Sequence, residues 1–288
     1  MKIILVIVAL LLVMPKPVNA WGETGHRVVC QIAYDEISDA ARTEVDRLIA
    51  LDPLYENFAD SCLFADFPER IRWQEHFMNL PRNARSIATA DCPLAQSCVL
   101  TAIPKDAALL SDGMADDQKL LAMKLLGHWV GDIHQPLHVS FQDDRGANSV
   151  AADIAPAVRP AQFDPHANLH GVWDYLIIAQ RMGDDYIAIA EEMRQTITQQ
   201  DRAAWRYDSP VEWADESFQI TIDPSTEYCV QRKGTCRYTE NNRMLNDGEP
   251  IKAVPIDARY LERHEATVRQ RLKQAGIRLA VLLERLAQ

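Results

Sequence analysis

Two pairs of histidine and aspartate stand four residues apart inside strongly apolar segments, and this spacing constrains the fold more than any other feature. His128 and Asp132 lie in "KLLAMKLLGHWVGDIHQ", and His170 and Asp174 lie in "NLHGVWDYLIIAQRM". Residues four apart share one face of an α-helix. Each pair would therefore bury a carboxylate and an imidazole among core residues, which costs several kcal/mol unless something compensates.

The hydrophobic pattern is helical along nearly the whole chain. Apolar residues recur at helical spacing from 116 to 135, and Pro136 ends the pattern. No segment keeps a strict alternation of apolar and polar residues, so little β-structure is expected. The sequence predicts an all-α fold, a single mainly helical domain. Further helices are expected over 40–51 with Asp39 as the cap, 168–182, 185–200 and 257–288, and loops over 79–106, 141–168 and 223–256.

The first 20 residues have the parts of a secretory signal. Lys2 precedes the apolar run "IILVIVALLLVM", and "VNA" ends at Ala20 with small or modest residues. A dozen apolar residues are too few for a typical membrane span, although a retained anchor is the alternative. The sequence predicts a signal peptide over 1–20, a domain over 21–288 that begins at Trp21, and a secreted or periplasmic protein.

Charge and cysteine content narrow the class of protein. The net charge of −11 argues against a basic groove for duplex nucleic acid, but not against a phosphate held by metal ions. The six cysteines, in an exported chain, favour disulfides over a thiolate zinc site, because no two stand in a CxxC pair. Among the 15 possible pairings we prefer Cys92–Cys98 and Cys229–Cys236, which leaves Cys30 with Cys62.

Five histidines stand in patterns with carboxylates, and a bound zinc ion would offset the cost of burying such a set. His138 follows Pro136 closely enough to fold back beside the first helical pair, and Asp66 and His76 flank "DFPERIRWQEH". Zinc takes imidazole and carboxylate ligands, and an open coordination position activates water. His134 faces away from the His128 stripe and is read as a non-ligand. His166 and His264 are given no role.

The motifs that carry these residues resemble a known family. In order, "WGETGH", a later Asp, "HF", "GHWVGDIHQPLH" and "NLHGVWD" are similar to the zinc-dependent single-strand nucleases of fungi, plants and bacteria, the S1/P1 type. "WADES" and "AGIRLAVLLERL" extend the resemblance over essentially all of 21–288. It implies a helical domain of the phospholipase C/nuclease type, built around a trinuclear zinc site.

The resemblance also implies a ligand set for three zinc ions per chain. The third ion would use the free amine and the carbonyl oxygen of Trp21, and an α-amine with a pKa of about 7.7–8.0 can yield its proton to zinc near neutral pH. That amine exists only after cleavage behind Ala20. The ligands would be Asp66, His76, His128 and Asp132 for one ion, His138, His170 and Asp174 for the second, and Trp21, His26 and the shared Asp132 for the third.

The implied activity is hydrolysis of single-stranded DNA and RNA to 5′-mononucleotides, with 3′-nucleotidase activity, by a monomer that does not contact the membrane after cleavage. The catalytic residues would be Asp66, Asn79 and Asn148, with Phe77 and Asn148 binding the substrate. Asn79 stands where several family members have Asp, so it can orient water but cannot accept a proton. Phe77 would stack on a nucleobase; core packing is the alternative, as an ordinary turn is for Asn148. Either Arg70 or Arg72 would approach the phosphate.

Two other readings remain open. A zinc-dependent phospholipase C resembles the same fold, but it has Glu where this chain has Asp174 and a longer gap between its terminal Trp and first His. A non-catalytic exported zinc-binding protein is the second alternative. Structural zinc sites are usually closed and rich in cysteine, unlike the set found here.

Overall fold

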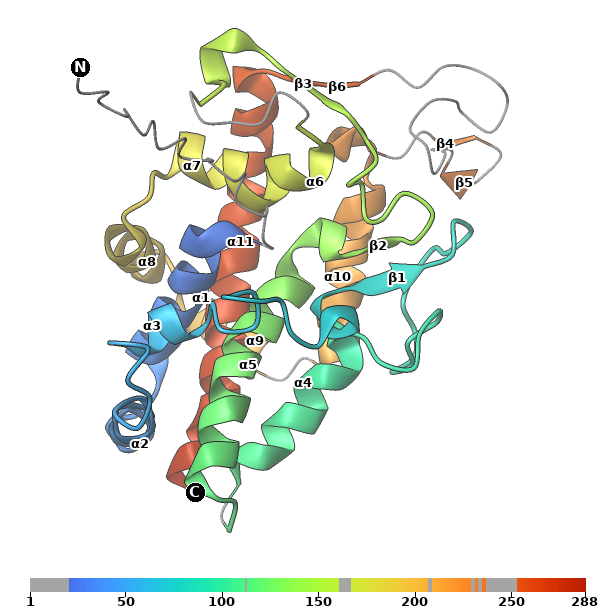
Figure 1. Ribbon diagram of the computed structural model, residues 1–288. Helices are drawn as coiled ribbons and strands as arrows, with labels where there is room; N and C mark the ends of the chain where they lie inside the picture. Colours follow the sequence, from blue (N-terminus) through green and yellow to red (C-terminus); the bar gives the residue numbers. More distant parts are fainter. Residues whose placement is uncertain are drawn as a thin grey trace, which may run out of the picture.

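A computed structural model describes residues 21–288 except 112, 161–166, 207–208, 229–230, 233–234 and 237–252. The predicted all-α fold is confirmed, because helices dominate these residues (Figure 1). The helices are α1 Gly22–Glu36, α2 Asp39–Ile49, α3 Phe58–Ser61, α4 Val99–Ala107, α5 Asp116–His134, α6 Leu169–Gly171, α7 Ile177–Arg181, α8 Tyr186–Gln195, α9 Gln199–Trp205, α10 Pro210–Ile222 and α11 Ala258–Leu283.

The long helices α5 and α11 run side by side in opposite directions through the middle of the molecule, with α1 packed against both (Figure 1). Helix α4 covers α5 on one side, and α10 covers it on another. The strands described are short and form two-stranded sheets. These sheets pair β1 Met78–Leu80 in parallel with β2 Val139–Phe141, β3 Ala152–Ile154 in parallel with β6 Val254–Ile256, and β4 Gln231–Arg232 in antiparallel with β5 Thr235–Cys236.

Two glycines on one face of α5 let α1 approach unusually closely. A methyl group at Gly131 would lie 2.6 Å from His26 Nδ1, and one at Gly127 would lie 2.2 Å from Cys62 Sγ and 2.8 Å from Cys30 Sγ. Real side-chain carbons do not approach other atoms so closely, so any larger residue would force the helices apart. The glycine face of α5 therefore sets the position of His26 and the disulfide that follows it by one helical turn.

Two predicted disulfides are confirmed. Cys30 in α1 is bonded to Cys62 at the end of α3, and Cys92 is bonded to Cys98 just before α4. Cys229 lies outside the described residues, so the pairing of Cys229 with Cys236 stays a prediction.

Several local predictions were wrong. The cap of α2 is Ser38 rather than Asp39, because the Ser38 hydroxyl accepts the backbone N–H of Ala41. The expected helix over 185–200 ends at Gln195, and Thr198 starts a new helix, α9, through a capping box. These short polar side chains compete with the helical backbone for its hydrogen bonds.

The region 79–106 was expected to be a loop, yet it contains α4. Pro104 lies inside this helix and hides its pattern, since proline removes a backbone donor. Burial of Val99, Leu100 and Ile103 offsets that loss. The segment 168–182 is helical as expected, but Val172–Leu176 forms a π-helical turn between α6 and α7.

The signal-peptide prediction falls on 1–20, outside the described residues. None of the helices in the described part of the chain combines the length and apolar character of a membrane-spanning segment.

We expect Gly131→Ala to destabilise the protein by about 1–3 kcal/mol, the usual cost of overpacking a core. In an unobstructed helix the same change would stabilise the protein by about 1 kcal/mol. The sign of the change in unfolding free energy therefore shows whether α1 packs closely against Gly131. Urea unfolding measures it. Leu121→Ala, at a position of α5 that is 42% exposed, is the control and should change stability by less than about 1 kcal/mol. A Gly131→Ala protein more stable than the wild type would contradict the close contact.

Candidate metal centre

Three carboxylates and five imidazoles meet where the C-terminal half of α5 faces α1 and the π-helical turn. Most of them are at most 4% exposed, and only the His170 side chain reaches 12%. The structure thus brings together all the side chains predicted as ligands from widely separated segments. They are His26 from α1, Asp66 and His76 from the connection between α3 and β1, His128 and Asp132 from α5, His138 after Pro136, His170 from α6 and Asp174 from the π-helical turn.

The ligand atoms of four of these residues are separated as they would be around one tetrahedral ion. His76 Nδ1 lies 3.2 Å from Asp132 Oδ2 and 3.6 Å from Asp66 Oδ1. His128 Nε2 lies 3.4 Å from Asp132 Oδ2, 3.6 Å from Asp66 Oδ2 and 3.1 Å from His76 Nδ1. Ligands about 2.0–2.1 Å from a tetrahedral zinc ion are about 3.3 Å from each other. The geometry fits the predicted set for one ion.

Backbone carbonyls fix which ring nitrogens of His76 and His128 face the centre. His76 Nε2 donates to the oxygen of Ile71, and His128 Nδ1 donates to the oxygen of Cys62, both at 2.9 Å. Each remaining nitrogen then presents a lone pair, and these two lone pairs face each other at 3.1 Å. Two acceptors at this distance repel unless a cation or a proton lies between them.

Backbone carbonyls also orient the histidines of the second group, which consists of His138, His170 and Asp174. The ligand atoms of this group all lie within 4.8 Å of one another. His138 Nδ1 donates to the oxygen of His76 and His170 Nδ1 to the oxygen of Gly146, both at 2.6 Å. His170 Nε2 lies 3.2 Å from Asp174 Oδ2. This group contains the ligands predicted for the second ion.

A third group joins His26, His128 and Asp132, whose ligand atoms also lie within 4.8 Å of one another. His26 Nε2 lies 3.5 Å from Asp132 Oδ1, and the His26 ring stacks on His128 with centroids 4.0 Å apart. Asp132 thus offers one oxygen to each side, as its predicted sharing between two ions requires. The sequence did not indicate that His128 also lies between two groups.

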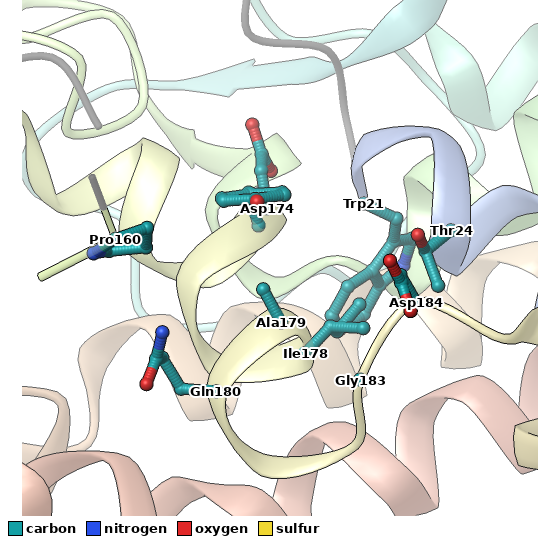
Figure 2. A pocket seen from close by; sticks show the side chains of 10 residues that line it. Trp21, Thr24, Pro160, Asp174, Ile178, Ala179, Gln180, Gly183 and Asp184 are labelled. Atoms are coloured by element: carbon teal, nitrogen blue, oxygen red, sulfur yellow. The ribbon is translucent and has the colours of Figure 1, made fainter. Parts of the chain in front are cut away.

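The position of Trp21 agrees with a role beside the centre. Trp21 is fully buried just before α1, and its carbonyl oxygen accepts the N–H of Gly25 at 3.0 Å. A Cβ built at Gly22 would lie 3.3 Å from the backbone oxygen of Asp174. Figure 2 shows Trp21 and Asp174 lining one pocket, with the Asp174 carboxylate pointing away from Ile178. The start of α1 is therefore packed against the turn that carries a predicted ligand.

Buried atoms without a hydrogen-bond partner concentrate at this centre. An unpaired buried polar atom costs about 1–3 kcal/mol, more when it is charged, and several such atoms together call for a missing ligand. Metal ions bound in the three groups would give a partner to each of these atoms except His26 Nδ1, because an imidazole ligand offers an ion only one of its ring nitrogens. The unpaired atoms are both ring nitrogens of His26, Asp66 Oδ2, both carboxylate oxygens of Asp132, His138 Nε2 and Asp174 Oδ2.

The ionisation states also suit a metal. Burial and the neighbouring His26 lower the pKa of His128 to about 3, and burial lowers the pKa of His138 to about 4, so both rings are neutral at pH 7. Burial opposes ionisation of Asp132, but His128 and His138 hold its pKa well below the usual value. Neutral imidazoles and ionised carboxylates are the forms that bind metal.

Arg70 and Arg72 bind different carboxylates. Arg70 Nε donates to Asp66 Oδ1 at 2.6 Å, whereas Arg72 turns to Asp106, with its Nη1 2.7 Å from Oδ2. Arg70 is thus the arginine that approaches the centre. Two of the remaining histidines pair away from the centre: His134 Nδ1 donates to the oxygen of Val130 while its Nε2 accepts from Arg278, and His264 Nε2 donates to the oxygen of Ser225. His166 lies outside the described residues.

The residues predicted to touch substrate belong to segments that also carry or support predicted ligands: Phe77 and Asn79 follow His76, and Asn148 follows the turn whose Gly146 oxygen accepts from His170. Asn79 is half-buried in β1, opposite Ser140 of β2, between the buried Met78 and Leu80. Asn148 is exposed, and its amide donates to the oxygen of Arg145 at 2.9 Å. Phe77 is half-buried, in edge-on contact with Trp73.

Sequence reasoning missed the residues that hold the end of α5 in place. Ser217 Oγ donates to the oxygen of Ile133 at 2.6 Å, and Arg271 Nε donates to the oxygen of His134 at 3.2 Å. These carbonyls have no partner within α5, because they belong to its last turn. Helices α10 and α11 therefore orient the turn that leads to His138. Only the resemblance of "WADES", which contains Ser217, pointed to this contact.

A left-handed turn supports His170 in a similar way. Arg145, Gly146 and Ala147 have φ angles of 57°, 62° and 64°, a conformation that costs non-glycine residues about 1–2 kcal/mol each. The buried Asp144 accepts the N–H of Ala147 at 2.9 Å and so stabilises the turn. The turn presents the oxygen of Gly146 to His170, and a Cβ at Gly146 would lie 2.6 Å from the oxygen of Leu137.

Comparison with known proteins agrees with this geometry. A family model described as S1/P1 Nuclease matches residues 21–288. The chain is 26% identical to Endonuclease 2 of Arabidopsis thaliana over 99% of this chain and 97% of that protein. It is 28% identical to Endonuclease 3 of the same plant over 96% and 93%, and 23% identical to Nuclease S1 of Aspergillus oryzae over 93% and 92%. The family indicated by the motifs is confirmed, and the chain belongs to the S1/P1 nuclease family.

Proposed function

We propose that this nuclease is an exported, zinc-dependent endonuclease that cleaves single-stranded DNA and RNA to 5′-mononucleotides and also hydrolyses 3′-nucleotides. The observation that supports it most is the approach of His76 Nδ1 and His128 Nε2 to 3.1 Å with their lone pairs facing each other. Asp66 and Asp132 lie around these two nitrogens. Neutral imidazoles combined with carboxylates at these separations suit zinc.

The two further groups support a centre with three ions. The carbonyl oxygen of Trp21, which accepts one N–H, keeps a second lone pair for a metal. We assign the ligands as Asp66, His76, His128 and Asp132 for the first ion, His138, His170 and Asp174 for the second, and Trp21, His26 and Asp132 for the third.

Bound zinc ions would polarise the phosphate and lower the pKa of a water molecule. The chain's own residues would position the reactants. Asp66, held by Arg70, would orient the attacking water, and the half-buried amide of Asn79 would hold it by hydrogen bonding without taking its proton. The exposed amide of Asn148 would donate to a phosphate oxygen.

The proposed activity is tested on four substrates. Protein with its zinc bound should hydrolyse denatured DNA and RNA, cleave duplex DNA far more slowly, and leave phosphatidylcholine intact. Release of acid-soluble nucleotides and of phosphocholine measures the two reactions. Hydrolysis of the lipid without hydrolysis of denatured DNA would instead identify a phospholipase C.

Export and activation would be a single event, because the amine of Trp21 is free only after residues 1–20 are removed. We expect one extra residue before Trp21 to remove one zinc ion per chain and to reduce kcat strongly. Metal analysis and kinetics on denatured DNA measure both effects. The same residue added after Gln288 is the control. Full zinc content and full activity in the N-terminally extended protein would exclude the amine as a ligand.

Phe77 is expected to stack on a nucleobase at the site. Phe77→Ala should raise KM for a dinucleotide about 10-fold, because stacking contributes about 1–3 kcal/mol per base, while Phe77→Tyr should keep KM near the wild-type value. Steady-state kinetics with zinc content checked in each protein makes the measurement. An unchanged KM in the alanine variant would leave Phe77 only a packing role.

A further inference from the structure

Trp73 is a large aromatic side chain that stands exposed beside the metal centre. It is 59% exposed and begins the short 3-10 helix Trp73–His76, which ends at a predicted zinc ligand. Trp73 and His76 therefore belong to one turn, which places the backbone of Trp73 beside the centre.

Arg70 connects the indole to the centre directly. Its Nε donates to Asp66 Oδ1 at 2.6 Å, and its guanidinium carbon lies 5.0 Å from the centroid of the Trp73 ring. Asp66 is 1% exposed at its side chain, while Arg70 is 22% exposed. The bond to Asp66 thus anchors the guanidinium of Arg70, and the indole of Trp73 packs on that guanidinium. An exposed indole held in this way loses little conformational entropy when it binds a ligand.

The exposed ring of Trp73 and the half-buried ring of Phe77 are nearly perpendicular. Trp73 and Phe77 contact each other edge to face, with centroids 6.0 Å apart and planes at 80°. Consecutive bases in a duplex lie parallel, so they cannot stack on two faces at right angles. Consecutive bases of an unpaired strand can separate and turn, and each can then lie on its own ring.

We propose that Trp73 is a stacking subsite for a second nucleobase, adjacent in the strand to the base that stacks on Phe77. This inference rests on the proposed nuclease function and adds a preference for substrates of two or more nucleotides. The positive charge of Arg70 lies beside the indole, where the phosphate that links the two bases would pass. Its Nε is bonded to Asp66, so its other N–H groups are the ones that would donate to this phosphate.

The subsite predicts that Trp73 affects long and short substrates differently. A 3′-mononucleotide has one base, which Phe77 serves, so Trp73→Ala should change its KM by less than about twofold. A dinucleotide uses both rings, so its KM should rise about 10-fold with kcat within about twofold of the wild type. Trp73→Phe, which keeps a stacking face, should restore KM for the dinucleotide.

The test measures both substrates with four proteins: wild type, Trp73→Ala, Trp73→Phe and Leu54→Ala. Leu54 is an apolar residue that is 76% exposed on the turn after α2, and its replacement should change neither KM. Zinc content and the thermal midpoint show that each variant is folded. An equal rise of KM for both substrates, or no rise for the dinucleotide, would overturn the subsite.

A binding measurement separates failure of the subsite from failure of the proposed function. A dinucleotide with a phosphorothioate linkage, which is hydrolysed slowly, is titrated into each protein while tryptophan fluorescence is recorded. Wild type should show quenching and about 10-fold tighter binding than Trp73→Ala. If wild type cleaves no nucleic acid, the proposed function fails, and this titration still decides the subsite. Equal affinities of wild type and Trp73→Ala would contradict it.

Discussion

The structure depends on two imidazole nitrogens, His76 Nδ1 and His128 Nε2, which lie 3.1 Å apart with their lone pairs facing each other. Backbone carbonyls take the other N–H of His76 and of His128, so neither ring can turn its proton inward without losing a buried hydrogen bond. With Asp66 and Asp132 beside them, this arrangement is unfavourable alone and favourable around a cation. A bound metal ion would therefore turn this arrangement from a cost into a contribution to folding.

The scaffold is built to bring these groups close together. Gly127 and Gly131 remove side chains from one face of α5, which allows His26 to stack directly on His128. At the far end of α5, Ser217 and Arg271 bind the last carbonyls and fix the direction of the chain toward the second metal group. Close helix packing and the hydrogen bonds at the end of α5 thus hold the polar side chains of the centre in place, as side-chain burial does in an apolar core.

The sequence predicted the helical class and the side chains that come together at the centre, but not the residues that support them. A pair such as His170 and Asp174 is visible because both residues belong to one helix, and the family motifs then joined the separate segments. Ser38 and Thr198 decide where helices begin through local side-chain hydrogen bonds, which a hydrophobic pattern does not show. The pairing of Arg70 rather than Arg72 with Asp66 depends on how the chain turns after Pro68, and only the folded backbone determines that.

Anomalous diffraction at the zinc absorption edge, measured on crystals of the processed protein, would show whether the buried histidine–aspartate groups bind metal. We expect three peaks, one of them about 2.0–2.2 Å from His76 Nδ1, His128 Nε2 and the Asp132 carboxylate. If protein that hydrolyses denatured DNA showed no anomalous density between His76 and His128, these groups would not be the metal sites of the enzyme.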